Sequence, residues 1–203
     1  MVRNRVFAAV YVEEWVGKNP VSSDGDCMFV LETERLVLRD FLEDDFDAFY
    51  ATSNDPEYQQ FYAEHETTRD FWQTIFDRIL AGTAVSDRRM YQLAICLPAG
   101  ELIGTCGLRI EQPEHQQASF GCAIARDHWG KGYAYEACRR LFDFGFTSLP
   151  IHRVYAETIS ENWRARMLAE RLGMQLEGEL RHNRFFRGRW WNTAVYAVIT
   201  DVK

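Results

Sequence analysis

The chain has 203 residues, of which 47% are hydrophobic and 14% aromatic, and this is enough for one domain with a single substantial core. The net charge of −7 argues against general binding to nucleic acid, which needs clustered positive charge. The five cysteines are scattered and no histidine has a partner at ligand spacing, so we expect reduced thiols, a cytoplasmic location and no metal site.

Residues 1–32 are predicted to form an N-terminal extension and linker. The apolar run from Val6 to Val12 is too short to span a membrane, and no clear cleavage site follows it, so we expect no membrane association. The segment 20–26 is rich in Pro, Ser, Gly and Asp and is typical of a linker. We therefore place the domain at residues 33–203 and expect Met28 to be the natural start.

Hydrophobic periodicity predicts the elements of this domain in chain order. Helices are expected after Asp44 or Asp45, from Thr67, after the glycines near Gly132, and from Asn162 to Gly173. The predicted strands are 36–40, 91–97, 101–110, 118–125, 153–158, 174–181 and 193–200. Pro98 to Gly100 predicts a hairpin turn, and the arginines between the last two strands predict a solvated hairpin face rather than an RNA-contacting surface.

The run from His128 to Ala137 places two glycines, Gly130 and Gly132, where a predicted strand gives way to a predicted helix. Glycine lets the backbone approach a ligand closely, and a helix start offers unpaired N–H groups and the positive end of the dipole. The turn therefore suits a pyrophosphate. It is not an ATP-binding P-loop or a dinucleotide fingerprint, because Ala125 and Tyr135 occupy positions where those motifs need glycine.

Trp129, Gly132 and Ala134 fall on the acyl-CoA pattern of the GCN5-related N-acetyltransferases, which the chain resembles. The sequence Gly-Lys-Gly-Tyr-Ala followed by Glu-Ala is similar to the RimJ and RimL branch of that family. Five further segments match this branch in the same order along the chain: Thr33 to Arg39, Glu161-Asn162, Arg171 to Met174, Glu177 to Arg181, and Gly188 to Asn192 followed by Tyr196.

The resemblance implies an α/β fold with a mixed, mostly antiparallel sheet of six to seven strands, flanked by helices. Two parallel strands, 118–125 and 153–158, would splay apart and hold the pantetheine arm of acetyl-CoA between them. Amides from Gly130 to Ala134 would hold the pyrophosphate. The residues expected to bind this cosubstrate are Ile124, Trp129, Gly130, Lys131, Gly132, Tyr133, Ala134 and Asn162.

The implied chemistry is direct attack of a neutral primary amine on the acetyl thioester. The tyrosine that many relatives use as general acid is replaced by Ala169, the serine common in the RimJ and RimL branch by Ala165, and residues 118–121 carry no acid. The base must then come from elsewhere. Glu157 is the first candidate, and Glu111 and His65 are the others, with Glu64 and Glu66 as groups that would attract a cationic substrate.

Three functions follow from this reading. The first is acetylation of a protein N-terminal α-amine, as the branch resemblance implies. The second is acetylation of a small amine such as a polyamine, aminoglycoside or amino acid. The third is a non-catalytic acyl-CoA-binding regulator, which the missing polar groups would suit. Partners are then an amine substrate, either a peptide N-terminus or a small molecule, with a homodimer left open.

Overall fold

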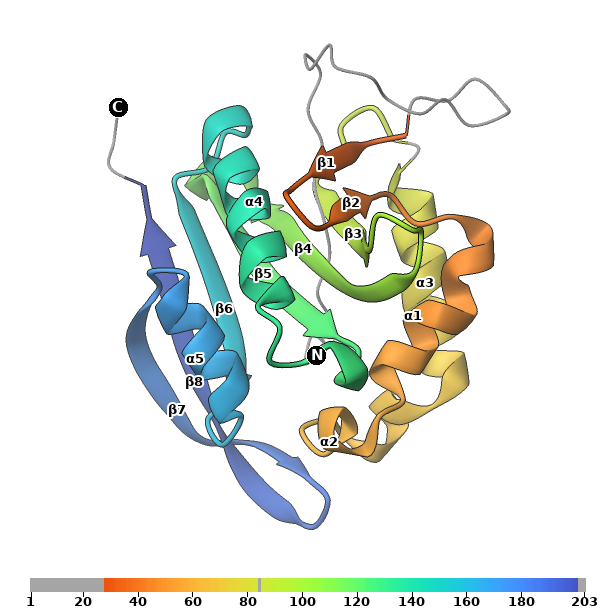
Figure 1. Cartoon of the computed structure of the whole chain (residues 1–203). Coiled ribbons are helices and arrows are strands. Elements are labelled where there is room, and N and C mark those ends of the chain that lie inside the picture. Colours follow the sequence, from red (N-terminus) through yellow and green to blue (C-terminus); the bar gives the residue numbers. More distant parts are fainter. Residues whose placement is uncertain (1–27, 84, 201–203) are drawn as a thin grey trace.

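The computed structural model describes residues 28–83 and 85–200. The predictions for residues 1–27 lie outside these described residues. One eight-stranded sheet forms the centre of the molecule, in the order β1-β2-β3-β4-β5-β6-β8-β7 (Figure 1). The strands are β1 Val30–Glu32, β2 Val37–Arg39, β3 Met90–Cys96, β4 Leu102–Gln112, β5 Gln117–Ile124, β6 Arg153–Ile159, β7 Gln175–Phe186 and β8 Arg189–Ile199.

Every neighbouring pair of strands is antiparallel except β5 and β6, so the mixed, mostly antiparallel class is confirmed. The sheet has eight strands rather than six or seven because β1, which the sequence patterns did not separate from the linker, pairs with β2. The last two strands are also longer than predicted. Cross-strand aromatic contacts extend them, with Phe185 opposite Trp190 and the ring of Phe186 stacked on that of Trp191.

Helices cover both faces of the sheet, with α4 and α5 in front of it and α1 and α3 behind it in Figure 1. The five helices are α1 Phe46–Ser53, α2 Pro56–Gln59, α3 Arg69–Thr83, α4 Tyr133–Ser148 and α5 Trp163–Arg171, with short 3-10 segments η1 Glu43–Asp45, η2 Glu64–Thr67, η3 Pro113–His115 and η4 Arg126–His128. Helix α3 begins one residue later than predicted. The hydroxyl of Thr68, not that of Thr67, accepts the hydrogen bond from the Phe71 amide.

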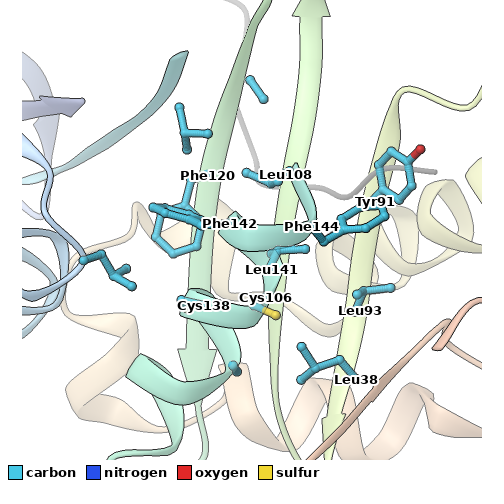
Figure 2. Packing of buried hydrophobic residues seen from close by; sticks show 14 of the residues in the cluster. Leu38, Tyr91, Leu93, Cys106, Leu108, Phe120, Cys138, Leu141, Phe142 and Phe144 are labelled. Atoms are coloured by element: carbon cyan, nitrogen blue, oxygen red, sulfur yellow. The ribbon is translucent and has the colours of Figure 1, made fainter. Parts of the chain in front are cut away.

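Two apolar clusters hold the helices on the sheet. In front, Leu141 and Phe142 of α4 pack on Leu108 of β4 and Phe120 of β5, with the Phe120 and Phe142 rings 4.8 Å apart (Figure 2). Behind, the cluster joins Phe49 of α1 and the buried face of α3 to Ala94 and Cys96 of β3. Because side chains alternate along a strand, successive residues of β5 and β6 face these two layers in turn.

The parallel contact between β5 and β6 is short. It consists of the three pairs from Gln117 with Arg153 to Ser119 with Tyr155. Beyond Ser119 and Tyr155 the two strands diverge toward their C-terminal ends, as Figure 1 shows. The helix α4 follows β5 and α5 follows β6, so both helices begin near the wide end of this gap. The predicted splayed pair is thus present in the structure.

Candidate active site

The glycine loop between η4 and α4 lies at the C-terminal end of β5. Gly130 and Gly132 have φ angles of +74° and +83°, in the left-handed region that favours glycine. Gly132 is the N-cap of α4, and no side chain caps that helix start. The first amides of α4 therefore have no partner from a capping side chain, and together with the helix dipole they form a site for an anionic group.

Arg35, in the turn between β1 and β2, braces this loop. Its guanidinium donates to the Lys131 carbonyl oxygen at 3.1 Å and pairs with the Glu136 carboxylate of α4 at 2.6 Å. The hydroxyl of Thr33 also donates to Glu136, at 2.6 Å. Burial opposes ionisation of Glu136, but the hydrogen bonds from Thr33 and Arg35 hold the pKa of its carboxyl below the ordinary value.

Trp129 closes the other side of the loop. Its indole Nε1 donates to the carbonyl oxygen of Ile124, the last residue of β5, at 2.6 Å. The guanidinium of Arg164, at the start of α5, lies 4.6 Å from the centre of the Trp129 ring. The Ile124 carbonyl is therefore occupied by an intramolecular bond, and a contact of the Ile124 backbone with pantetheine stays a prediction.

Asn162 stands opposite the glycine loop as the N-cap of α5. Its Oδ1 accepts a hydrogen bond from the Ala165 amide at 3.2 Å, so it has the capping role expected from the sequence. The cap holds the start of α5 beside the end of β6. A contact between acetyl-CoA and the side-chain amide nitrogen of Asn162 stays a prediction.

Two of the three predicted base candidates lie near the point where β5 and β6 separate. Glu111 of β4 accepts a hydrogen bond from the hydroxyl of Tyr155 at 2.8 Å and pairs with Arg109 at 3.0 Å. Tyr155 belongs to the last β5–β6 pair. Glu157 lies two residues further along β6, in its diverging part, and on the same face as Tyr155.

The third candidate, His65, is placed differently. It is exposed on η2. Its ring packs edge-on against the ring of Phe71 of α3, with the two ring centres 6.4 Å apart. Its neighbour Glu66 is 4% exposed, caps η2 through the Ala63 amide and pairs with Arg184 of β7. The carboxylate of Glu66 thus already has a cationic partner, and its attraction for a cationic substrate stays a prediction.

A half-enclosed cavity of about 30 Å³ lies behind the sheet, between β3, β4, β5 and the helices α1 to α3. It exists because its sheet wall is made of small residues, including Thr105 of β4 and Gly121 and Ala123 of β5. Gln92 of β3 and Cys122 of β5 also belong to the sheet wall, and the residues on the helix side are Phe49, Ser53, Tyr58, Tyr62, Trp72, Ile75 and Ile79. None of the described residues that line the cavity is charged.

Two of the lining residues each have a buried polar atom without a partner in the described part of the chain, Trp72 Nε1 and Gln92 Oε1. Both residues are buried, at 4% and 5% exposure. The hydroxyls of Tyr58 and Tyr62 bond to each other at 2.9 Å, and burial raises the pKa of both, so they are neutral. Sequence analysis missed this cavity; the lone amide of Gln92 in an apolar strand was the one signal for it.

Comparison with known proteins decides what this arrangement is. A family model described as an acetyltransferase (GNAT) domain matches residues 35–175, which is more than half of the chain. The chain belongs to the GNAT acetyltransferase family. It is 34% identical to an uncharacterized N-acetyltransferase, p20, of Bacillus licheniformis over 177 residues, covering 85% of this chain and 97% of that protein.

Two spermidine acetyltransferases are among the similar proteins. The spermidine N(1)-acetyltransferase of Escherichia coli K12 is 34% identical over 93 residues, covering 46% of this chain and 50% of that protein. The solved structure of the Vibrio cholerae spermidine N-acetyltransferase, in complex with CoA and spermine, has a TM-score of 0.71 at 24% identity, covering 83% of this chain and 97% of that one. At this identity the likeness shows the fold alone.

The enzyme is therefore an N-acetyltransferase of the GNAT family, with acetyl-CoA as cosubstrate. Ala169, which replaces the tyrosine acid of many relatives, is buried in α5 at 5% exposure.

Across residues 28–83 and 85–200, no group of three or more His, Cys, Asp or Glu side chains is placed to hold a metal ion. No helix within these same ranges is both long and apolar enough to cross a membrane.

Proposed function

We propose that this GNAT enzyme transfers the acetyl group of acetyl-CoA to a small-molecule primary amine. The observation that carries the proposal is the position of β5. One end of its diverging part leads to the glycine loop, and residues Gly121 to Ala123 of that part form a wall of the aromatic cavity. A thioester held beside β5 and an amine entering from the cavity would then meet at the same strand.

Acetyl-CoA would bind mainly to backbone atoms. Its pyrophosphate would accept hydrogen bonds from amides between Gly130 and Ala134, where the helix start and the positive φ angles favour an anion. The pantetheine arm would then follow the gap toward the Ser119–Tyr155 pair. At about 3.3 Å per residue, β5 covers roughly 17 Å from Ile124 to Ser119, so the thioester lies near the closed end of the gap.

The reaction needs a neutral amine. An alkylamine with a pKa near 10.4 is neutral only about once in 2,500 molecules at pH 7, so a base or desolvation has to favour deprotonation. Glu157 lies in the diverging part of β6 and is the proposed base. The hydroxyl of Tyr155, which donates to Glu111, lies at the closed end of the gap and is the proposed replacement for the missing tyrosine acid.

The dimensions of the cavity favour a small amine over a protein N-terminus. A volume of about 30 Å³ holds roughly two water-sized groups, so it admits the amine end of an unbranched chain. An N-terminal α-amine stands on an α-carbon that also bears the peptide carbonyl and, except in glycine, a side chain, which makes it wider. The spermidine acetyltransferases among the relatives also act on small amines.

The test is release of free thiol from acetyl-CoA with three acceptor panels: alkylamines and amino alcohols, polyamines, and peptides with a free N-terminus. Calorimetric binding of CoA is measured in parallel. We expect CoA binding and turnover with amines of the first panel. Turnover confined to peptides would overturn the choice of a small acceptor, and CoA binding without thiol release from any panel would contradict the proposed activity.

A further inference from the structure

Glu57 of α2 joins the two sides of the wide end of the gap between β5 and β6. Its carboxylate accepts a hydrogen bond from the guanidinium of Arg126, in η4, at 2.8 Å and pairs with the guanidinium of Arg164, in α5, at 3.2 Å. Arg126 follows the end of β5, and Arg164 follows the end of β6. One carboxylate therefore connects the segments that leave the two diverging strands, and Figure 1 shows α2 at this end of the gap.

Both guanidiniums also lie over the same indole ring. The centre of the Trp129 ring is 4.6 Å from Cζ of Arg164 and 6.0 Å from Cζ of Arg126. Trp129 directly precedes the two glycines of the loop, and its Nε1 donates to the Ile124 carbonyl oxygen. The four side chains form a closed set of contacts, called the Glu57 cluster below, in which two arginines link Glu57 to Trp129.

The backbone of Glu57 is fixed by the cap of its helix. Oδ1 of Asp55 accepts from the amides of Glu57 at 2.8 Å and Tyr58 at 3.3 Å, and Pro56 occupies the first helical position. The other carboxylate oxygen of Asp55 lies 3.6 Å from the guanidinium of Arg126. Because α2 is held at its start, the carboxylate of Glu57 determines where the two arginines lie.

The exposure of the Glu57 cluster limits the size of its effect. The side chains of Glu57, Arg126 and Arg164 are 36%, 52% and 48% exposed, and an isolated ion pair at such a surface contributes little. Here each guanidinium has two partners, so its displacement breaks an ion pair and a cation–π contact together. We therefore expect a change of a few-fold in ligand binding and little change in the stability of the fold.

We propose that Glu57 is a positioning residue for acetyl-CoA. Through Arg126 and Arg164 it fixes Trp129, and with it the glycine loop, relative to the start of α5. This arrangement keeps the loop amides in place for the pyrophosphate. The inference rests on the proposed placement of acetyl-CoA, and it is independent of which amine is the acceptor.

Positioning and simple charge effects predict opposite results when the carboxylate of Glu57 is removed. Acetyl-CoA is an anion, and E57Q leaves one more unbalanced positive charge at the wide end of the gap. If charge alone mattered, the affinity for acetyl-CoA would rise. If Glu57 positions the loop, the affinity falls, because Arg126 and Arg164 lose the partner that they share.

Two acetyl donors test the inference: acetyl-CoA and S-acetylpantetheine, which lacks the pyrophosphate and the nucleotide. Their KM values are measured by thiol release with one saturating amine, and calorimetry gives the affinity for CoA. We expect E57Q to raise the KM for acetyl-CoA and the Kd for CoA about fivefold, with kcat and the KM for S-acetylpantetheine unchanged. R164M should act similarly, and the double variant should show less than the product of the two single effects.

The matched control is D47N, which removes an exposed carboxylate paired with Arg69 at 2.6 Å, away from the Glu57 cluster. It should change neither KM. A KM for acetyl-CoA that is unchanged or lower in E57Q, or a KM that rises equally for both donors, would overturn the inference alone. Failure of the wild type to bind CoA would overturn the proposed function. Urea unfolding compares the stability of E57Q and D47N, and R164M tests the same cluster with α2 intact.

Discussion

The two proposed binding sites lie on different sides of β5. The donor side, proposed for acetyl-CoA, lies around the glycine loop and Arg35 and would present backbone amides to its ligand. The acceptor side, proposed for the amine, is the cavity behind β5 and would present side chains from β3, α1, α2 and α3. The donor side depends on two glycine φ angles and one ion-paired arginine. The acceptor side depends on which side chain occupies each position. The same strand thus lies between a proposed site that depends on backbone conformation and a proposed site that depends on side chains.

The largest effect is expected where the backbone itself is changed. Gly132→Val should weaken CoA binding at least 100-fold, because a β-branched residue strains a φ of +83° and displaces the amides at the start of α4. Gly173 also has a φ of +83° and lies at the end of α5, so Gly173→Val is a control with equal backbone strain. Calorimetry should show normal CoA affinity for that control; equal losses in both variants would mean that strain, not the loop, limits binding.

Removal of the proposed base should slow the reaction of the amine but leave the binding of acetyl-CoA unchanged. Glu157→Gln should lower kcat about 100-fold at pH 7, and less at pH 9, where more of the amine is already neutral. The KM for acetyl-CoA should not change. Glu114→Gln, at an exposed carboxylate of η3, controls for loss of one negative charge. An unchanged pH profile of kcat in Glu157→Gln would remove Glu157 from the mechanism.

A smaller effect is expected for Arg35, which holds the glycine loop in place. Arg35→Leu should raise the KM for acetyl-CoA about tenfold and leave the KM for the amine unchanged, because the Lys131 carbonyl and Glu136 lose their shared partner. Arg140→Leu is the matched control, since Arg140 of α4 donates to Glu32 of β1 rather than to the loop. A similar rise in both variants would assign the effect to the β1–α4 contact in general.

The smallest effect concerns stability and pH. Because the folded pKa of Glu136 is lowered, its contribution to stability is present above its unfolded pKa of about 4.3 and is lost as the pH falls through the folded value. Glu136→Gln should therefore be less stable than the wild type by under about 1 kcal/mol at pH 7. Urea unfolding should show this difference shrinking below about pH 4; a difference independent of pH would exclude the charge as its source.

The contrast between the two sides also explains what the sequence could reveal. The conformations of the glycine loop and of the cap at Asn162 depend on residues that are close together in the sequence. Their local patterns therefore predicted a turn and a helix cap that the structure contains. The divergence of the two parallel strands followed from the family resemblance and is also present. Strand β1 was missed because a three-residue strand beside a linker has no period to detect.

The acceptor side required contacts between distant residues. Glu66 is paired with Arg184, 118 positions later in the chain, so its carboxylate already has a cationic partner that no local pattern indicates. Gln92 and Trp72 come from a strand and a helix that meet only after folding. Their unpaired atoms are defined by what the neighbouring residues leave unbonded, and no local pattern in the sequence carries that information.

Gln92 and Thr105, in the sheet wall of the cavity, belong to a chain of hydrogen bonds that ends at Leu93. The hydroxyl of Thr105 in β4 accepts from the side-chain amide of Gln92 and donates to the carbonyl oxygen of Leu93, so it ties two neighbouring residues of β3 to β4 inside the sheet. A valine at position 105 has nearly the same shape but leaves the amide nitrogen of Gln92 without this partner. A methyl-for-hydroxyl exchange there would thus leave a buried amide unpaired and lower the stability of the fold without touching the glycine loop.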